Sequence, residues 1–307
     1  MAPSHTAANI VVPTIVLPSL ILSLPLILAS KVLGRIKRSL FKEHMKQKVV
    51  LITGASSGLG ENIAYEYAKR GARLALAARR EDRLQEVAKK ARTLGSPDVI
   101  VIRADIAKPE HCQRLVDEAV SHFGQLNHLV NNAGIWEAGF FEDCTDVSRY
   151  EREMDINFWG TVRTTHHAVP HLRKTKGRIV VISSVLGWYP APKSSFYNAS
   201  KAAVTAFFET LSVEFGSDIG VTIATPGVLD SEMTSGNFLK EAEMQDTPIM
   251  PVAAAAKSIV TSACRGDRYL TEPFWMRIVF LAQLIVPEFL NSFNHKRIAA
   301  SLSKKTA

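Results

Sequence analysis

Short apolar, β-branched runs alternate with amphipathic helical patterns from about residue 46 to about residue 270. The predicted strands are VVLIT (49–53), RLALAA (73–78), VIVIR (99–103), HLVNN (128–132), RIVVIS (178–183) and VTIAT (221–225). The clearest predicted helices are ENIAYEYAKRG (61–71), EDRLQEVAKKARTLG (81–95) and HCQRLVDEAVSHFG (111–124). Strands that are apolar throughout are typical of a sheet buried on both faces, and strand–helix alternation favours right-handed βαβ units. The pattern predicts a single α/β domain over 46–270 with a Rossmann-type, doubly wound parallel sheet.

An uncharged stretch from Ile10 to Ser30 precedes this domain. Its length is about that of a helix that crosses a bilayer. Pro13, Pro18 and Pro25 interrupt it, and each removes a backbone donor. We therefore expect residues 1–45 to form a hydrophobic membrane or lipid-droplet anchor, inserted as a kinked helix or a hairpin rather than a straight span.

The net charge of +8 is concentrated next to this anchor. Residues 31–48 hold seven Lys or Arg against the single acid Glu43, so they account for +6 of the total. This local distribution indicates attraction to anionic lipid headgroups rather than nucleic-acid binding. Because the first nine residues carry no Lys or Arg, the pattern disfavours a cleaved signal peptide and favours a domain that faces the cytosol.

The C-terminal extension, residues 271–307, contains a second apolar, helix-like stretch that runs up to Pro287. Three roles stay open for it: it caps a hydrophobic substrate pocket, docks on the membrane surface, or joins a homodimer. The three cysteines are far apart and fit neither a disulfide framework nor a zinc pattern.

Three glycines, Gly54, Gly58 and Gly60, lie between the first predicted strand and the first predicted helix. Glycines in a strand–turn–helix unit let backbone N–H groups and the helix dipole face a pyrophosphate. At the end of the second strand, where an acid would select NAD, the sequence has Arg79 and Arg80. Two guanidinium groups suit a 2′-phosphate, so the preferred cofactor is NADP(H), with NAD(H) possible if these arginines are only solvated.

Six motifs occur in register: TGASSGLG (53–60), NNAG (131–134), Asn157 in DINFWG, ISS (182–184), YNASK (197–201) and PG (226–227). Together they resemble the short-chain dehydrogenases/reductases over about residues 46–270. FYNASKAAV, VEFGSDIGVTIATPGVLDSEM and RYLTEPFW resemble, more narrowly, the plant 11-beta-hydroxysteroid dehydrogenase-like proteins of the steroleosin type. That family is associated with lipid droplets and the endoplasmic reticulum, and Pro13 and Pro25 resemble the paired prolines of its anchor.

The expected chemistry centres on Tyr197, which would donate a proton to a ketone oxygen or accept one from an alcohol. Lys201 lies four residues later on the same helix face, and its charge is expected to lower the pKa of the phenol. Ser184, or alternatively Ser183, would hydrogen-bond the substrate oxygen, and the family pattern favours Ser184. Asn157 would anchor a water that connects Lys201 to solvent, or else it is a buried amide that satisfies backbone groups.

The resemblance also implies which residues surround the cofactor and the substrate. Tyr197 and Ser184 would contact the substrate. Asp105 would meet the adenine, unless it is only a helix cap, and Ser231 stands where the family commonly has Thr and could hold the carboxamide. The expected cofactor-binding residues are Gly54, Ser56, Ser57, Gly58, Leu59, Gly60, Arg79, Arg80, Asp105, Ile106, Asn131, Asn132, Ala133, Gly134, Tyr197, Lys201, Pro226, Gly227 and Ser231.

The sequence therefore predicts an NADP(H)-dependent oxidoreductase that interconverts a hydroxyl and a ketone on a lipophilic, sterol-like substrate. The resemblance places it at the endoplasmic reticulum membrane or a lipid droplet, with the catalytic domain in the cytosol. Two alternatives are a lipid-droplet coat or scaffold protein and a reductase of specialised plant metabolites. The aromatic stripe Trp136, Phe140 and Phe141 belongs either to the core or to a substrate mouth.

Overall fold

The computed structural model describes residues 5–40, 42–242, 244, 247–292 and 294–296. The chain divides into two compact units, Met1–Glu43 and His44–Ala307. The second unit contains the sheet, and the C-terminal extension belongs to it.

A seven-stranded parallel sheet with the order β3-β2-β1-β4-β5-β6-β9 forms the centre of the second unit. Its strands are β1 (Val49–Thr53), β2 (Arg73–Ala78), β3 (Val99–Arg103), β4 (His128–Asn131), β5 (Arg178–Ile182), β6 (Gly220–Pro226) and β9 (Tyr269–Glu272). The two short strands β7 (Leu229–Asp230) and β8 (Met250–Pro251) pair separately. The predicted doubly wound sheet is confirmed, and β9 adds an edge strand that the apolar pattern does not indicate.

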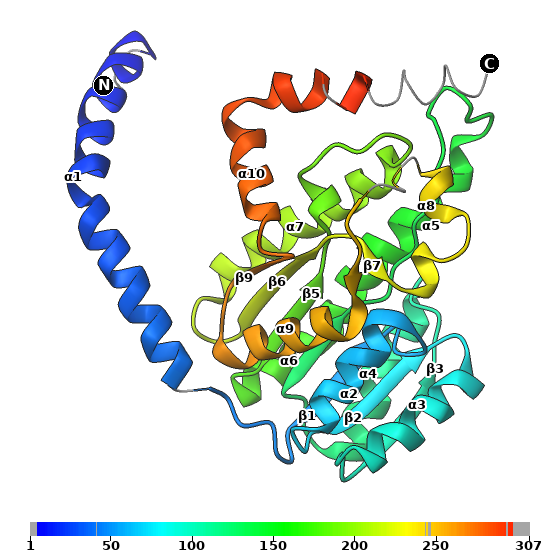
Figure 1. Ribbon diagram of the computed structural model, residues 1–307. Helices are drawn as coiled ribbons and strands as arrows, with labels where there is room; N and C mark the ends of the chain where they lie inside the picture. The colour runs from blue at the N-terminus through cyan, green and yellow to red at the C-terminus, as the bar shows by residue number, and fades with distance from the viewer. Residues whose placement is uncertain (1–4, 41, 243, 245–246, 293, 297–307) are drawn as a thin grey trace. The chain divides into compact units, whose positions relative to one another are not determined.

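Helices cover both faces of this sheet (Figure 1). The main helices are α2 (Gly58–Ala68), α3 (Glu81–Thr93), α4 (Pro109–Phe123), α6 (Thr161–Thr175), α7 (Ser195–Phe215), α9 (Val252–Arg265) and α10 (Met276–Ile285). Shorter elements are α5 (Glu151–Met154), α8 (Phe238–Glu241), the π-helix η2 (Asp155–Gly160) and the 3-10 helices η1 (Val147–Tyr150), η3 (Val185–Gly187) and η4 (Glu232–Thr234).

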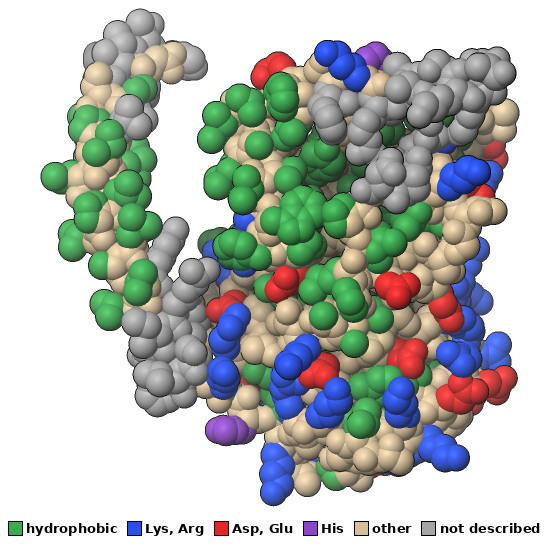
Figure 2. Space-filling view, in the orientation of Figure 1, with side chains coloured by type: hydrophobic (Ala, Val, Ile, Leu, Met, Phe, Trp, Pro, Cys, Tyr) green, Lys and Arg blue, Asp and Glu red, His purple; other side chains and the backbone are tan. Residues whose placement is uncertain are grey.

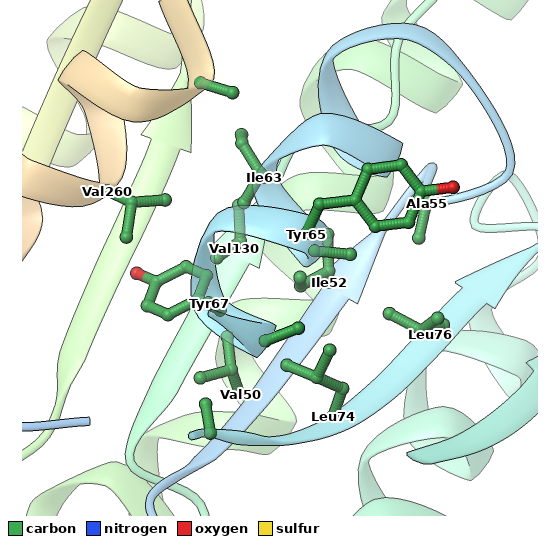
Figure 3. Close-up of a cluster of buried hydrophobic side chains, with 14 of the residues drawn as sticks. Val50, Ile52, Ala55, Ile63, Tyr65, Tyr67, Leu74, Leu76, Val130 and Val260 are labelled. Atoms are coloured by element: carbon green, nitrogen blue, oxygen red, sulfur yellow. The ribbon is translucent and has the colours of Figure 1, made fainter. Parts of the chain in front are cut away.

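The side-chain alternation of β1 explains why there are two helical layers. Val50 and Ile52 point to one face, where they pack with α2, α3 and α9 (Figure 3). Val49 and Leu51 point to the other face, where they pack with α4, α6 and α7. Every residue of β1 is buried, and each large aliphatic side chain contributes about 1.5–3 kcal/mol on leaving water. A strand covered on both sides needs no polar face, which is why its sequence is apolar throughout.

The first unit is dominated by α1 (His5–Leu40), which continues through Pro13, Pro18 and Pro25 as one helix (Figure 1). Its segment Pro13–Gly34 is long and apolar enough to cross a membrane. Of the two expected forms, a kinked helix or a hairpin, the described residues therefore form a helix. Each proline interrupts one turn without reversing the chain, and the hydroxyls of Ser19, Ser23 and Ser30 bond to carbonyls of their own helix.

Candidate active site

The strand order reverses between β1 and β4, because β2 and β3 lie on one side of β1 while β5, β6 and β9 lie beyond β4. In open α/β sheets this switch point leaves a crevice at the carboxyl ends of the strands. A cavity of about 1010 Å³ is found there, lined by residues that range from Gly54 to Asn294. This volume is at the upper end of ligand pockets, enough for a dinucleotide and part of a second molecule.

The turn between β1 and α2 requires glycine for two reasons. Gly54 and Gly58 have φ values of +67° and +57°, which side chains other than glycine rarely adopt. A Cβ atom on Gly54 would also lie 2.7 Å from Cα of Ala133, and one on Gly60 would lie 2.3 Å from the Gly54 carbonyl oxygen. The backbone therefore forms a narrow cradle in front of the α2 N-terminus. This cradle fits the pyrophosphate of a dinucleotide cofactor.

Arg80 closes the far end of the cradle. Its Nη2 donates to Oγ of Ser57 at 2.6 Å and to Oε2 of Glu232 at 2.9 Å. Glu232 begins η4, so this ion pair links the end of β2 with a loop that follows β6. Hydrogen bonds from Arg80 and Ser57 lower the pKa of the Glu232 carboxyl, which keeps it ionised at neutral pH. Arg79 also lines the cavity, so the two arginines lie where the sequence places a 2′-phosphate.

Most of the residues expected around the cofactor and substrate line this one cavity, and Gly60, Asn131 and Asn157 do not. Gly60 instead lets α2 pack against the Gly54 carbonyl. Asn131 donates to Thr165 at 2.8 Å, within the layer between β4 and α6. The expected residues that do line the cavity are Gly54, Ser56, Ser57, Gly58, Leu59, Arg79, Arg80, Asp105, Ile106, Asn132, Ala133, Gly134, Ser184, Tyr197, Lys201, Pro226, Gly227 and Ser231.

Tyr197 lies in the first turn of α7 and is buried, with its ring stacked on that of Trp136 at a centroid distance of 5.0 Å. Burial raises the pKa of its hydroxyl, although a hydrogen bond with Ser184 lowers it in part. Desolvation by burial outweighs the hydrogen bond with Ser184, so Tyr197 stays protonated at neutral pH. The expected lowering of the phenol pKa by the Lys201 charge stays a prediction.

Lys201 is buried beside it, four residues further along α7. Its Nζ donates to the carbonyl of Ile182 at 3.0 Å and lies 5.6 Å from the Tyr197 ring centroid. Burial lowers the pKa of the ammonium group to about 8, against the opposing charge of Glu153. Lys201 thus carries its charge at neutral pH and is close to losing it.

The two adjacent serines at the end of β5 have different partners. Ser183 Oγ donates to the Lys201 carbonyl at 3.0 Å and bonds to Thr205, so it fastens α7 to the sheet. Ser184 Oγ accepts from the Leu186 N–H at 3.1 Å and shares a hydrogen bond with Tyr197. This arrangement favours Ser184 over Ser183 as the residue that faces the reacting oxygen.

Asn157 lies within the π-helix η2, between α5 and α6. Its Oδ1 accepts from the Ile135 N–H at 2.8 Å, and its Nδ2 donates to the Ile135 carbonyl and to Ser200. Both amide groups therefore bind the protein itself, as in the alternative interpretation of a buried amide. Its side chain fastens the segment after β4 next to α7, and neither of its groups reaches the cavity.

An apolar wall faces the cradle across the cavity. Trp136, Met276 and the partly buried Val279 belong to one hydrophobic cluster and line the cavity. Phe141, by contrast, is exposed, so the aromatic stripe divides between a wall and the surface. α10 supplies two of these wall residues, while its Ile278 and Ile285 are 67% and 75% exposed, and Figure 2 shows apolar side chains gathered over this part of the unit.

Three polar residues of the site carry no local sequence signal. Glu232 pairs with Arg80, and Glu153 is a fully buried carboxyl behind Lys201. Asn294 accepts from the Tyr189 hydroxyl at 2.9 Å and donates to the Pro190 carbonyl, so it closes the cavity from the C-terminal segment. Each of these interactions joins residues at least 48 positions apart, and no spacing motif reveals it.

A nucleotide cradle at a sheet switch point, next to a buried Ser–Tyr–Lys group, defines a class of enzyme. The sequence family of short chain dehydrogenases matches residues 48–242, and the chain belongs to this family. It is an oxidoreductase that acts on CH–OH groups.

Among curated proteins, the chain is 51% identical over 297 residues to 11-beta-hydroxysteroid dehydrogenase A of Sesamum indicum, covering 93% of this chain and 85% of the relative. It is 47% identical over 294 residues to 11-beta-hydroxysteroid dehydrogenase 1A of Arabidopsis thaliana, covering 92% and 84%. An alcohol dehydrogenase of Thermococcus sibiricus, solved with 5-hydroxy-NADP, is 25% identical with a TM-score of 0.64, covering 74% of this chain and 95% of that chain. A short-chain dehydrogenase/reductase of Burkholderia phymatum, solved with NAD, has the same fold at 24% identity and a TM-score of 0.71, covering 80% and 95%.

Proposed function

We propose that the protein is an NADP(H)-dependent oxidoreductase that interconverts a ketone and a hydroxyl on a lipophilic, sterol-like molecule. The observation that carries the proposal is a single cavity with a glycine cradle and two arginines at one end, Tyr197 in the middle and an apolar wall at the other. This order matches a charged dinucleotide, a reacting carbonyl and a hydrophobic substrate body.

The cofactor end is built by the segments that follow β1, β2, β3 and β7. The cradle at Gly54 and Gly58 would hold the pyrophosphate, and Arg79 and Arg80 would hold a 2′-phosphate through charge-assisted bonds. When bound, the nicotinamide cofactor supplies or accepts the hydride. Asp105 and Ile106 would border the adenine, and Ser231 would bind the carboxamide end. NAD(H) remains the weaker alternative, because a bare ribose hydroxyl gives the arginines no charge to bind.

Proton transfer is assigned to Tyr197. Its hydroxyl is protonated at neutral pH, because burial raises its pKa, so a proton is present to deliver to a ketone oxygen. A neighbouring positive charge that lowers this pKa would make the phenol a better acid. Ser184 shares a hydrogen bond with the same hydroxyl and would stabilise the developing charge on that oxygen. Lys201, charged below its pKa of about 8, would compensate the phenolate that remains. The arrangement favours reduction near neutral pH and oxidation at higher pH.

The substrate class follows from the apolar wall and from the relatives. Trp136, Met276 and Val279 offer no charged group to the cavity, so they favour a lipophilic body over a sugar or an acid. The relatives at 46–51% identity carry the name 11-beta-hydroxysteroid dehydrogenase, which supports a sterol-like molecule. A specialised plant metabolite of similar shape and polarity would meet the same wall.

The proposed location is the endoplasmic reticulum membrane or a lipid droplet, with the catalytic domain in the cytosol and homodimer formation possible. Support comes from the apolar segment Pro13–Gly34, which has the length of a membrane span, and from the basic residues that follow it. A lipid-droplet coat protein would need the same anchor. It would not need a buried tyrosine held protonated between a serine and a lysine.

Tyr197→Phe tests the proposed function. Loss of an acid group in proton transfer typically costs about 10²–10⁴-fold in rate, so kcat for ketone reduction with NADPH should fall by at least about 10²-fold. The affinity for NADPH, measured by fluorescence titration, should stay within about threefold. Tyr269→Phe is the matched control, because Tyr269 lies outside the cavity and its hydroxyl donates to Glu209. Unchanged turnover in Tyr197→Phe would exclude Tyr197 as the acid. NADPH binding with no turnover of any lipophilic ketone or alcohol by the unmodified protein would favour the coat alternative.

A further inference from the structure

The segment that follows β4 is held from behind by two side chains of one short helical stretch. Glu153, in α5, accepts from the Glu137 N–H through Oε1 at 2.8 Å. Asn157, four residues later, bonds to the N–H and carbonyl of Ile135. Residues 135–137 thus lie against this helix, while Trp136 between them stacks on Tyr197. The carboxyl and the amide therefore occupy the layer directly behind the proposed catalytic residues.

The catalytic lysine belongs to the same neighbourhood. A Cβ atom placed on Gly134 would lie 3.1 Å from Oδ1 of Asn157 and 3.4 Å from Nζ of Lys201. The ammonium of Lys201 and the carboxyl of Glu153 interact electrostatically, and so do the hydroxyl of Tyr197 and that carboxyl. A side chain at position 134 would crowd both Asn157 and Lys201, and α5, which carries Glu153, packs against α7, which carries Lys201.

Glu153 is an unusual residue to find there, because it is 0% exposed and only one of its oxygens is satisfied. Among the described residues, Oε2 has no hydrogen-bond partner. A buried carboxylate without a full set of donors is costly, and a neutral amide could accept the same Glu137 N–H without that cost. The structural contact therefore explains an acceptor at position 153 but does not explain an acid.

On the basis of the function proposed above, we propose that Glu153 is a positioning residue of the active site: its carboxyl group controls how firmly Lys201, and through it Tyr197, retains a proton. When Glu153 is ionised, its negative charge favours the Lys201 ammonium and disfavours the Tyr197 phenolate. When Glu153 is protonated, both effects vanish. The carboxyl thus keeps the lysine charged and the phenol protonated as the pH rises.

The charges around Glu153 agree with this role. Burial raises the pKa of Glu153, the hydrogen bond from the Glu137 N–H lowers it, the Glu137 carboxylate raises it and the Lys201 charge lowers it, so that it lies at about 7. Arg149, from η1, pairs with Glu137 at 3.1 Å and so screens that second acid. With Lys201 at a pKa of about 8, the acid and the base titrate close to each other and close to neutral pH. Two such groups titrate as a coupled pair rather than independently.

The primary test is the pH profile of kcat for NADPH-dependent ketone reduction in Glu153→Gln. Gln keeps an acceptor for the Glu137 N–H but removes the charge. The alkaline limb, where the activity is lost, should move to lower pH by about one unit, the smaller end of the shift that a neighbouring charge causes. Glu151→Gln is the matched control, because this exposed acid lies in the same helix, and its profile should match that of the unmodified protein. If the Glu153→Gln profile also coincides with the unmodified one, the inference is wrong.

The pH dependence of the thermal midpoint is a second test, which needs neither substrate nor cofactor. It can be carried out even if Glu153→Gln does not fold. The thermal midpoint of the unmodified protein should decline as the pH rises through the Glu153 titration near 7. In Lys201→Gln, the carboxyl loses its positive neighbour, so this decline should move to higher pH by about one unit. Coincident declines in the two proteins would overturn the coupling. Failure of the proposed function would be seen in a different experiment: Tyr197→Phe would keep its turnover.

Discussion

The preference for NADPH should depend on Arg80, and the structure allows the size of the effect to be worked out. Arg80→Ala removes a guanidinium that Ser57 and Glu232 already hold at the mouth of the cradle. A hydrogen bond to a charged group contributes about 1.5–3 kcal/mol, and about 1.4 kcal/mol corresponds to a tenfold change in affinity. The Kd for NADPH should rise by about 10- to 100-fold, while the Kd for NADH should change by less than about threefold.

The assay is equilibrium titration of cofactor fluorescence with both dinucleotides at two salt concentrations. Arg83→Ala is the matched control, because Arg83 pairs with Glu86, with both side chains about half-exposed, and does not line the cavity. Loss of the Arg80–Glu232 ion pair should itself change stability by less than about 1 kcal/mol, since both side chains are about half-exposed. An NADPH-to-NADH affinity ratio that is equal in Arg80→Ala and Arg83→Ala would refute the assignment of the 2′-phosphate site.

Replacing Glu232 should have the opposite effect on NADPH affinity from replacing Arg80. Its carboxylate occupies Arg80 at 2.9 Å and would compete with a phosphate for the same guanidinium. Glu232→Gln removes this competing charge, so NADPH should bind about threefold to tenfold more tightly, with little change for NADH. Weaker NADPH binding in this variant would mean that Glu232 helps to hold the cofactor instead of competing with its phosphate.

Three further predictions concern the cradle, the buried acid and the anchor. Gly60→Ala places a Cβ atom 2.3 Å from the Gly54 carbonyl oxygen, so cofactor affinity should fall by more than about tenfold. An unchanged Kd in cofactor titration would contradict this prediction. Glu153→Gln should gain stability relative to the unmodified protein as the pH rises from about 5 to about 8. The pKa of Glu153 is raised from 4.5 to about 7, so its contribution is present below 4.5 and is lost as the pH rises through 7. Between these two pH values, the difference in free energy of unfolding between Glu153→Gln and the unmodified protein should change by at most about 3 kcal/mol. Urea unfolding measures it, and a difference that is the same at both pH values would mean that Glu153 titrates normally. Removal of residues 1–40 should release the protein from membranes into the soluble fraction, and retention of the truncated protein on vesicles would show a second attachment site.

The sequence was sufficient for the sheet because burial on both faces leaves a continuous apolar run that is easy to recognise. The ends of β1, β2 and β3 match the predicted runs, whereas β9 was missed because YLTE, at the edge of the sheet, mixes polar and apolar residues. The sequence left a kinked helix and a hairpin open for the anchor, because a proline disturbs a helix locally without showing whether the chain reverses; α1 is one helix.

For the site, the motifs predicted which residues lie together, but not how burial changes their pKa values. The pKa of Tyr197 shifts upward because the residue is buried. Part of its surroundings is the Trp136 ring, 61 positions away in the sequence, and spacing along α7 cannot reveal this contact. Glu153 follows the exposed Glu151 and Arg152, so its neighbours in sequence suggest a solvated face. Burial of a charge depends on tertiary packing, and local pattern carries little information about it.

The contacts of Asn294 have a consequence for the order in which the enzyme is built during translation. The cofactor end of the cavity uses residues from Gly54 to Ser231, but the opposite end also needs the contacts that Asn294 makes with Tyr189 and Pro190. The cavity can therefore close around a lipophilic guest only after residue 294 has been made. A shortened chain that lacks Asn294 should still bind dinucleotide but turn over a lipophilic ketone slowly.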